Sequence, residues 1–181
     1  GTNPLNNGSA HTFSFNIHSS VEYDDYKIYG YIVVGYDSNG NEYKTVHFDD
    51  DVYVENVFGG NNQGGVTSTS HVTLTNGTYD SIYGGGEKAT TGTTNVIVDG
   101  VTVNEVVYGG GDQAPINTDT SVIIRNHADV QGDVFGGGNN GKILGNTVVD
   151  VDTSSVSHNV YGGGNAADVN GTTSVTIEKQ S

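Results

Sequence analysis

Apolar and polar residues alternate in short runs along this chain, and one such run returns five times. Each run holds two apolar side chains two residues apart, which places both on one face of a β-strand. The pairs are Val72 and Leu74, Val96 and Val98, Val122 and Ile124, Val149 and Val151, and Val175 and Ile177. No segment shows the roughly 3.6-residue period of an amphipathic helix. The pattern therefore predicts an all-β protein.

An aromatic residue followed by glycines marks one point in every repeat. The last copy reads Val-Tyr-Gly-Gly-Gly, and the aromatic positions are Phe58, Tyr83, Tyr108, Phe135 and Tyr161. Successive positions are 25, 25, 27 and 26 residues apart. A period this regular is typical of stacked-repeat architectures. The repeats then run over residues 57–81, 82–106, 107–133, 134–159 and 160–181.

The repeat length and its turns predict a parallel β-helix of about five coils, with two or three short strands in each. A turn follows each of the first four apolar pairs, at Asn76-Gly77, Asp99-Gly100, Asn126 and Asp152. A further apolar position recurs at Val103, Val130 and Val156, with Thr78 expected there in the first copy. We expect a right-handed coil from the crossover preference of parallel strands. A two-layer sandwich is the structural alternative.

Stacked coils would superpose equivalent residues and build a structural ladder. Its predicted members are Phe58, Tyr83, Tyr108, Phe135 and Tyr161, with Gly84, Gly109, Gly136 and Gly162. Phe and Tyr exchange at the aromatic position, so we expect ring stacking to matter more than the hydroxyl. The glycines indicate either positive φ angles or backbones so close that a Cβ atom would clash.

The chain before the repeats has a different pattern. Residues 1–10 are rich in Asn and Gly and are expected to form a flexible leader. Alternation from His11, a second apolar run over 26–34 and a return run over 42–48 predict a small antiparallel β unit within 11–56. Asn39-Gly40 has the residues of a hairpin turn. We expect this unit to cap the first coil or to form an independent domain, because an open solenoid end exposes unpaired backbone.

Composition excludes several classes of partner. The formal net charge is −15, from 21 acidic and 6 basic residues, and the basic residues are scattered. Nucleic acid and anionic membrane surfaces both need clustered Lys or Arg, so neither is an expected partner. The chain has no Cys for disulfides or thiolate chemistry, and no apolar run long enough for insertion into a membrane. The acidity suits solubility outside the cell.

The repeats resemble those of bacterial cell-surface and secreted β-solenoid proteins of the adhesin or autotransporter-passenger type. Those repeats follow V-[FY]-G-G-G-[ND] with G-x-T-x-V-x-I, and the copies beginning at Val134 and Val160 fit best. The resemblance covers 57–181 and implies an exported, extracellular or cell-surface β-solenoid. No signal peptide is visible in this sequence, and from Gly1 in place of Met we expect a processed or trimmed chain. The first copy departs from the motif, with Asn61 after only two glycines.

Catalysis is the less favoured prediction. Parallel β-helices include polysaccharide lyases and hydrolases, whose sites cluster acids on one face, often with calcium and a Lys or Arg base. Here most acids stand singly at turns, although a two-residue spacing would place Asp150 and Asp152 on one face if both lie in a strand. Arg125, the single arginine, has no obvious acid partner in the sequence. We predict a non-enzyme, with a carbohydrate-active β-helix enzyme as the alternative.

No cofactor is predicted, and calcium is the one metal left open. The segment 37–42 alternates oxygen ligands but lacks the Gly and the final Glu of an EF-hand loop, since Phe48 stands at the last position. A hairpin turn is the favoured interpretation. The histidines lack the spacing of a zinc site. They are His11, His18, His47, His71, His127 and His158.

The sequence favours a non-catalytic adhesin or display stalk. The segments after the glycines differ most between copies, so we expect a glycan or a host or matrix protein to bind there. These loops span 61–65, 87–92, 112–117, 139–145 and 165–171. The aromatic ladder is a second candidate for sugar binding if its rings are exposed. Neighbouring copies of the chain are the alternative partner, in a fibre built through open solenoid ends.

Overall fold

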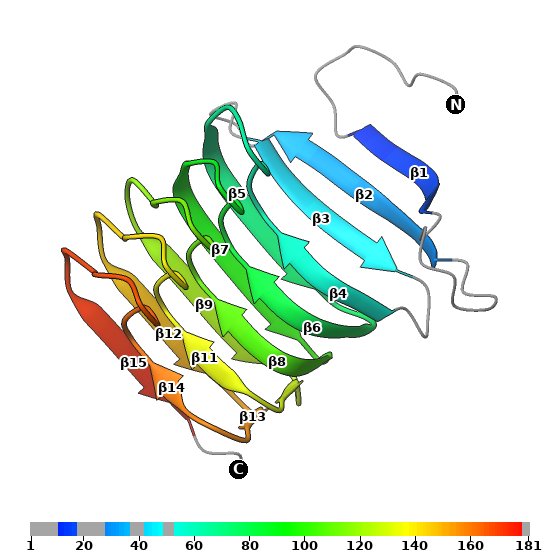
Figure 1. Ribbon diagram of the computed structural model, residues 1–181. Coiled ribbons are helices and arrows are strands. Elements are labelled where there is room, and N and C mark those ends of the chain that lie inside the picture. Colours follow the sequence, from blue (N-terminus) through cyan, green and yellow to red (C-terminus); the bar gives the residue numbers. More distant parts are fainter. Residues whose placement is uncertain (1–10, 18–27, 37–41, 49–52, 179–181) are drawn as a thin grey trace.

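The structure is a computed structural model, and it describes residues 11–17, 28–36, 42–48 and 53–178. Within these residues the regular elements are all β-strands, and none is a helix. Residues 53–178 wind into a stack of parallel coils (Figure 1). Each strand pairs with the equivalent strand one repeat later, so the predicted parallel β-solenoid is confirmed and the sandwich alternative is wrong.

The first sheet of the stack carries the strands that lead into the glycines. In chain order they are β4 (Tyr53–Phe58), β6 (Thr78–Tyr83), β8 (Thr102–Tyr108), β10 (Asp129–Val130), β11 (Asp133–Phe135), β13 (Ser155–Val156) and β14 (Val160–Tyr161). All pair in parallel. In the last two coils the strand is divided, so that β10 and β11 both pair along β8.

The second sheet carries the alternating apolar pairs. Its strands are β5 (Thr67–Leu74), β7 (Thr91–Asp99), β9 (Thr120–Arg125), β12 (Thr147–Val151) and β15 (Thr173–Ile177). The register joins equivalent residues, as Val96 to Val122 and Val122 to Val149. Single bridges join Thr91, Ile116, Ile143 and Val169 in sequence. A complete coil thus contributes a strand segment to each sheet and one bridging residue at a third position.

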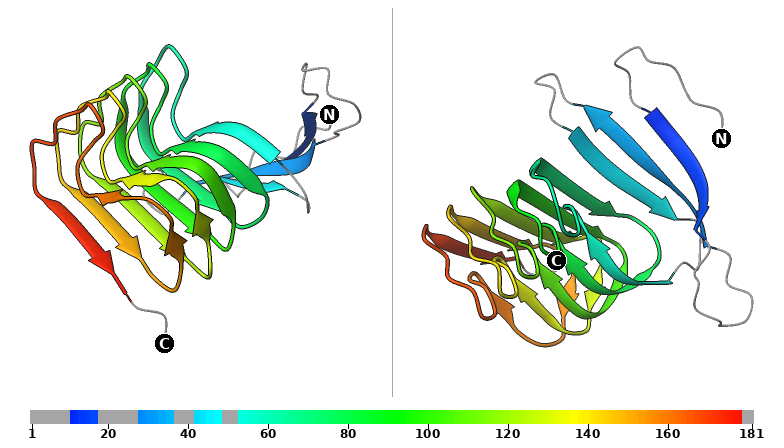
Figure 2. Two further views of the ribbon diagram at one scale, coloured as in Figure 1. Left: turned by 60° about the horizontal axis from the view of Figure 1, so that its bottom comes forward. Right: turned by 45° about the horizontal axis from the view of Figure 1, so that its top comes forward.

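The core lies between the two sheets, which Figure 2 shows facing each other along the stack. The apolar pairs of the inner coils point inward, and Val96, Val98 and Val122 are fully buried. Fully burying an aliphatic side chain contributes about 1.5–3 kcal/mol, so each added coil extends the core by several such terms. A thin, continuous core of this kind explains how a chain with 33% apolar residues is ordered.

One interior position differs from the sequence prediction. Tyr79, rather than Thr78, is in register with Val103, and its side chain is fully buried. The register shifts between Tyr79 and Ser81, because β8 has one more residue than β6 before the next inward side chain. The sequence prediction places the inward residue four positions before Ile82, at Thr78, whereas in this coil it lies three positions before, at Tyr79. A buried tyrosine replaces valine at this point of the second coil.

The described residues before the stack form an antiparallel sheet. β2 (Ile28–Tyr36) pairs with β1 (His11–Ile17) on one side and β3 (Glu42–Phe48) on the other, which confirms the predicted antiparallel unit. β3 lies beside β5 (Figure 1; Figure 2). β4 already belongs to the parallel stack, which therefore includes residues 53–56 as well as the predicted repeats from 57. The leader 1–10 and the hairpin turn at 39–40 lie outside the described residues.

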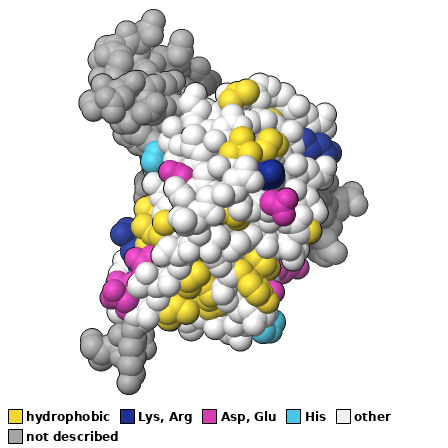
Figure 3. Space-filling view, turned by 90° about the vertical axis from the view of Figure 1, so that its left-hand side faces the viewer, with side chains coloured by type: hydrophobic (Ala, Val, Ile, Leu, Met, Phe, Trp, Pro, Cys, Tyr) yellow, Lys and Arg dark blue, Asp and Glu magenta, His cyan; other side chains and the backbone are white. Residues whose placement is uncertain are grey.

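The last coil exposes inward-facing side chains at one end of the stack. Val175 and Ile177 continue the columns of Val149 and Val151, but 41% and 63% of their surfaces are exposed. Val149 itself is fully buried because β15 covers it. Figure 3 looks onto this side of the molecule, where hydrophobic side chains gather on the surface.

Candidate functional site

The aromatic residues of the five repeats form one continuous column on the first sheet. Neighbouring rings have centroids 4.6, 5.1, 5.0 and 4.8 Å apart, with interplanar angles of 8° to 16°. Parallel strand pairing sets this spacing, since adjacent strands lie about 4.8 Å apart. The stacked rings are Phe58, Tyr83, Tyr108, Phe135 and Tyr161.

Stacking leaves little ring face for a ligand. Both faces of Tyr108 are covered by its neighbours, and Tyr108 and Phe135 are each 6% exposed. Tyr161 is the last ring of the column and is 44% exposed. A sugar that stacks on an aromatic ring needs an open face. The inner rings therefore stabilise the coil stack, and the exposed ring of Tyr161 at the C-terminal end of the column offers a face to solvent.

The hydroxyls of Tyr83 and Tyr108 stay protonated at neutral pH. Burial raises the pKa of Tyr108 to about 12, and the nearby Tyr83, Asp112 and Asp133 add to this. Burial also raises the pKa of Tyr83, with contributions from Asp112 and Glu105. The hydroxyl of Tyr108 donates a hydrogen bond to Oδ1 of Asn139 at 3.3 Å. The column is thus linked at its edge to a polar side chain of the following loop.

The glycines after each ring form a corner at which successive coils touch through their backbones. The amide of Gly84 donates to the carbonyl of Tyr108, and the amide of Gly109 donates to that of Phe135. A Cβ atom on Gly109 would lie only 2.3 Å from the carbonyl oxygen of Gly136. The φ angles of these glycines are not positive. Close backbone approach, and not backbone conformation, therefore requires glycine here.

At the inner corners, a buried threonine hydroxyl from the second sheet donates a hydrogen bond to a glycine carbonyl. Thr94 donates to the carbonyl oxygen of Gly109, and Thr120 donates in the same way to Gly136. Both threonines are at most 2% exposed. A buried polar group without a partner is costly, so the pairing satisfies the hydroxyl and a carbonyl lone pair together. The corner is consequently held by backbone and side-chain bonds.

Most acidic residues that the sequence analysis treated as singletons accept hydrogen bonds from the next coil. The side-chain Nδ2 of Asn139 donates to Asp112 at 2.7 Å, and the hydroxyl of Ser155 donates to Asp129 at 2.6 Å. The other pairs one repeat apart are Asp80 with Asn104, Asp99 with Asn126, Asp119 with Asn146 and Asp133 with Asn159. These carboxylates connect coils and do not converge on one point.

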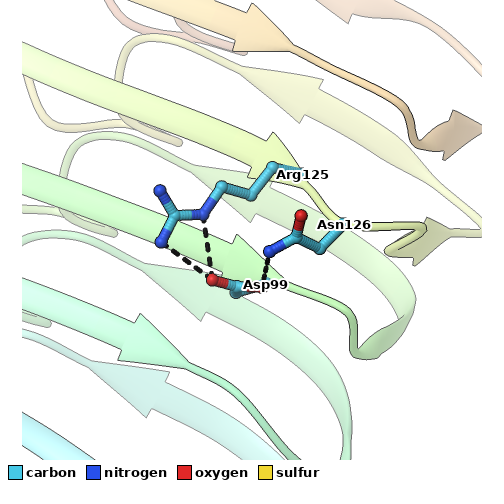
Figure 4. Close-up of polar contacts among 3 residues, drawn as sticks. All are labelled: Asp99, Arg125 and Asn126. Carbon is cyan, nitrogen blue, oxygen red and sulfur yellow. Dashed lines mark hydrogen bonds and ion pairs between the residues drawn. The ribbon is translucent and has the colours of Figure 1, made fainter. Parts of the chain in front are cut away.

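The prediction that Arg125 has no acid partner is wrong. Its guanidinium lies 2.8 Å from Asp99, which also accepts from the Nε of Arg125 and from the side-chain Nδ2 of Asn126 (Figure 4). Asp99 and Arg125 pair in register across β7 and β9. Their separation of 26 residues equals the repeat length, so aligning the repeats would have identified the pair.

Calcium, the metal that the sequence leaves open, has no candidate site in the described part of the chain. Within it, no group of three or more His, Asp or Glu residues could hold a metal ion. Residues 37–41 of the calcium candidate lie outside the described residues. Asp150 lies on the outer side of β12 between Ile123 and Thr176 of the adjoining strands, and Asp152 follows the end of that strand.

The variable loops stack in register along one edge of the solenoid. The amide of Gln113 donates to the carbonyl of Glu87, and the amide of Asn140 donates to that of Asp112. The side-chain Nδ2 of Asn165 donates to Oδ1 of Asn139 and so adds a side-chain contact between the loops. Behind the loops, Ile116 and Ile143 are buried. The loops are therefore ordered and present polar side chains at fixed spacing.

Comparison with protein-family models, with curated proteins and with solved structures finds no match to this chain. The residues described here include no helix that is long and apolar enough to cross a membrane.

Proposed function

We propose that this chain is a non-catalytic, extracellular β-solenoid segment of a bacterial surface protein, which displays its loop edge to a glycan or to a host or matrix protein. The observation that carries the proposal is the ordered loop edge. Inter-coil bonds fix the loop backbones, while exposed side chains such as Gln113, Asn140 and Lys142 differ from coil to coil. A rigid edge with varied polar groups can bind with little loss of conformational entropy.

The hydrogen bonds that the carboxylates accept from neighbouring coils also support a non-catalytic role. Asp112, Asp119 and Asp133 each accept from a neighbouring coil, so these acids contribute to stacking. A glycoside hydrolase needs two carboxyl groups held on opposite sides of one bond. Carbohydrate-active catalysis stays the alternative to test, by incubating the chain with polysaccharides and measuring new reducing ends or unsaturated products.

A binding screen tests the display role. The chain is applied to glycan and matrix-protein arrays, with calcium and again with a chelator. We expect saturable binding that falls when Gln113, Asn140 and Lys142 are replaced together by Ala. A matched variant, Asn95→Ala with Ser121→Ala, alters outward positions of the second sheet and should bind like the parent. No binding in any condition, or equal loss in both variants, would contradict recognition by the loop edge.

A fibre subunit is the second candidate, favoured by the exposed side chains of the last coil. Val175, Ile177 and Tyr161 are at least 41% exposed, and β15 has a free edge in the described sheet. Exposed strand edges pair readily with other chains. Light scattering over a concentration series distinguishes the two roles. Growth of mass that is lost in an Ile177→Lys variant would favour the fibre, and a constant mass would exclude it for this chain.

A further inference from the structure

The turn between β5 and β6 contains one of five Asn-Gly pairs in the chain. The others are Asn7-Gly8, Asn39-Gly40, Asn140-Gly141 and Asn170-Gly171, of which the first two lie outside the described residues. Glycine lacks a Cβ, so the backbone nitrogen that follows such an asparagine is unusually open to reaction. The three described pairs differ in what that nitrogen contacts.

Two of these nitrogens are held by the preceding coil. The amide of Gly141 donates to the carbonyl of Asp112 at 3.0 Å, and the amide of Gly171 donates to that of Gly145 at 3.0 Å. The turn glycine of the next coil is held too, since Gly100 donates to Arg125 at 3.0 Å. For each of them, attack on a neighbouring side chain requires an inter-coil hydrogen bond to break.

The nitrogen of Gly77 instead contacts the side chain that it could attack. It lies 3.0 Å from Oδ1 of Asn76, in a turn where Gly77 has a φ of +98°. Both residues are half-buried, so water can reach the turn. The carboxamide carbon bonded to Oδ1 is therefore beside the nitrogen in the folded state, an arrangement that lowers the entropic cost of ring closure.

Tyr79 supplies the second observation. Its side chain is fully buried, and its hydroxyl donates to the carbonyl oxygen of Asn76 at 2.5 Å. That oxygen belongs to the peptide whose nitrogen is in Gly77. When this nitrogen loses its proton, the charge spreads onto the oxygen, where a fixed donor stabilises it. Burial raises the pKa of Tyr79, so the hydroxyl remains a donor in mildly alkaline solution.

From this geometry we propose that Asn76-Gly77 is a self-modifying site, at which Tyr79 promotes conversion of Asn76 to aspartate and isoaspartate. Hydroxide removes the amide proton of Gly77, and the nitrogen attacks the carboxamide carbon of Asn76. The bond to Nδ2 breaks, and ammonia leaves after taking a proton from water. Water then opens the cyclic imide at either carbonyl. Isoaspartate adds a backbone carbon at the entry to β6 and introduces a negative charge.

Peptide mapping by mass spectrometry tests the proposal on the full chain. The folded protein is held at mildly alkaline pH, and amide-to-acid conversion is followed at residues 76, 140 and 170. One additional hydrogen bond to the anion, from the hydroxyl of Tyr79, corresponds to about a tenfold change in rate, so we expect Asn76 to react about ten times faster than Asn140 and Asn170. Isoaspartate at position 76 should accumulate together with aspartate.

The Tyr79→Phe variant tests the role of the hydroxyl while keeping the ring. We expect about a tenfold slower reaction at Asn76 and unchanged rates at Asn140 and Asn170, with circular dichroism checking the fold. The same mapping in concentrated urea controls for sequence context and does not depend on the variant folding. Equal rates at the three sites in the folded chain, an unchanged rate in a folded Tyr79→Phe variant, or selectivity that persists in urea would each overturn the proposal.

Discussion

Each inner coil changes direction at a glycine corner and at an opposite Asn- or Asp-containing turn, and the two places restrict the sequence differently. The corner repeats as Gly84, Gly109 and Gly136 with φ angles that are not positive. The opposite turn does use positive φ, yet it holds Gly77 in one coil and Thr153 in another. The turn, which has the unusual backbone conformation, therefore accepts more residue types than the corner does.

Steric contact between coils explains the difference. At the corner a Cβ atom would overlap a carbonyl oxygen of the adjoining backbone, which cannot move without breaking the ladder of hydrogen bonds. At the turn, a side chain in the left-handed region costs only about 1–2 kcal/mol. The same residue type is thus required in every coil because neighbouring coils touch there, and not because of the local backbone conformation.

Replacing a corner glycine should cause the largest loss of stability. In Gly109→Ala the new methyl would lie 2.3 Å from the oxygen of Gly136, and we expect unfolding free energy to fall by about 3 kcal/mol or more. Gly64→Ala is the matched control, because no atom lies within 4 Å of its Cβ position, and it should change stability by less than about 0.5 kcal/mol. Equal effects in urea titrations would refute contact as the cause.

Removing one ring from the column should have the next largest effect. Tyr108→Leu abolishes two stacked pairs, and each pair contributes about 0.5–1.5 kcal/mol beyond its buried area. We therefore expect a loss of about 1–3 kcal/mol, measured by thermal or urea unfolding. Tyr108→Phe keeps the ring and should stay within about 0.5 kcal/mol of the parent. A large loss in the Phe variant would show that the hydroxyl bond dominates.

The sequence identified the columns, because a column needs only one residue type at one point of the period. Phe58 to Tyr161 and the turns at Asn76, Asp99 and Asn126 were located this way. The sequence could not show whether the glycines are needed for a positive φ angle or for close backbone approach, since glycine permits both. Contacts between coils, such as Arg125 with Asp99, appear only after the repeats are superposed.

Buried Tyr79 was also missed, because coils of unequal length shift the count between inward positions. Val54 and Val57 stand three residues apart, whereas Val103 and Val107 stand four apart. Strand pairing fixes which residues correspond, and a period averaged over the chain does not. The candidate loop edge could be placed from sequence variation, but its stacking depends on backbone bonds that no residue pattern specifies.

Relieving strain at the opposite turn should raise stability. Thr153 has a φ of +48°, where a β-branched residue is strained and glycine is not. Thr153→Gly should gain about 0.5–1 kcal/mol, after allowing for the greater freedom of glycine in the unfolded chain. Differential scanning calorimetry measures the shift in melting temperature. A fall in stability would mean that the threonine side chain matters more than the backbone.

High pH should weaken the corner side of the coil, an effect that is absent at neutral pH. The pKa of Tyr108 is raised to about 12 from an ordinary value of 10.0, so the unfolded chain releases this proton first. The stabilisation is complete below pH 10 and is lost as pH rises toward 12. Tyr108→Phe should lose less stability over this range than the parent. Equal pH dependence would contradict the burial of this hydroxyl.

Native-state hydrogen exchange at the corner tests the central claim most directly. The amides of Gly84, Gly109 and Gly136 each donate to a carbonyl of the following coil. If these contacts hold the stack together, the three amides should exchange only through unfolding of whole coils, as slowly as the inward residues of β7 and β9. Exchange as fast as in the exposed loop at Gly64 would show that the corners open locally and that the coils are held elsewhere.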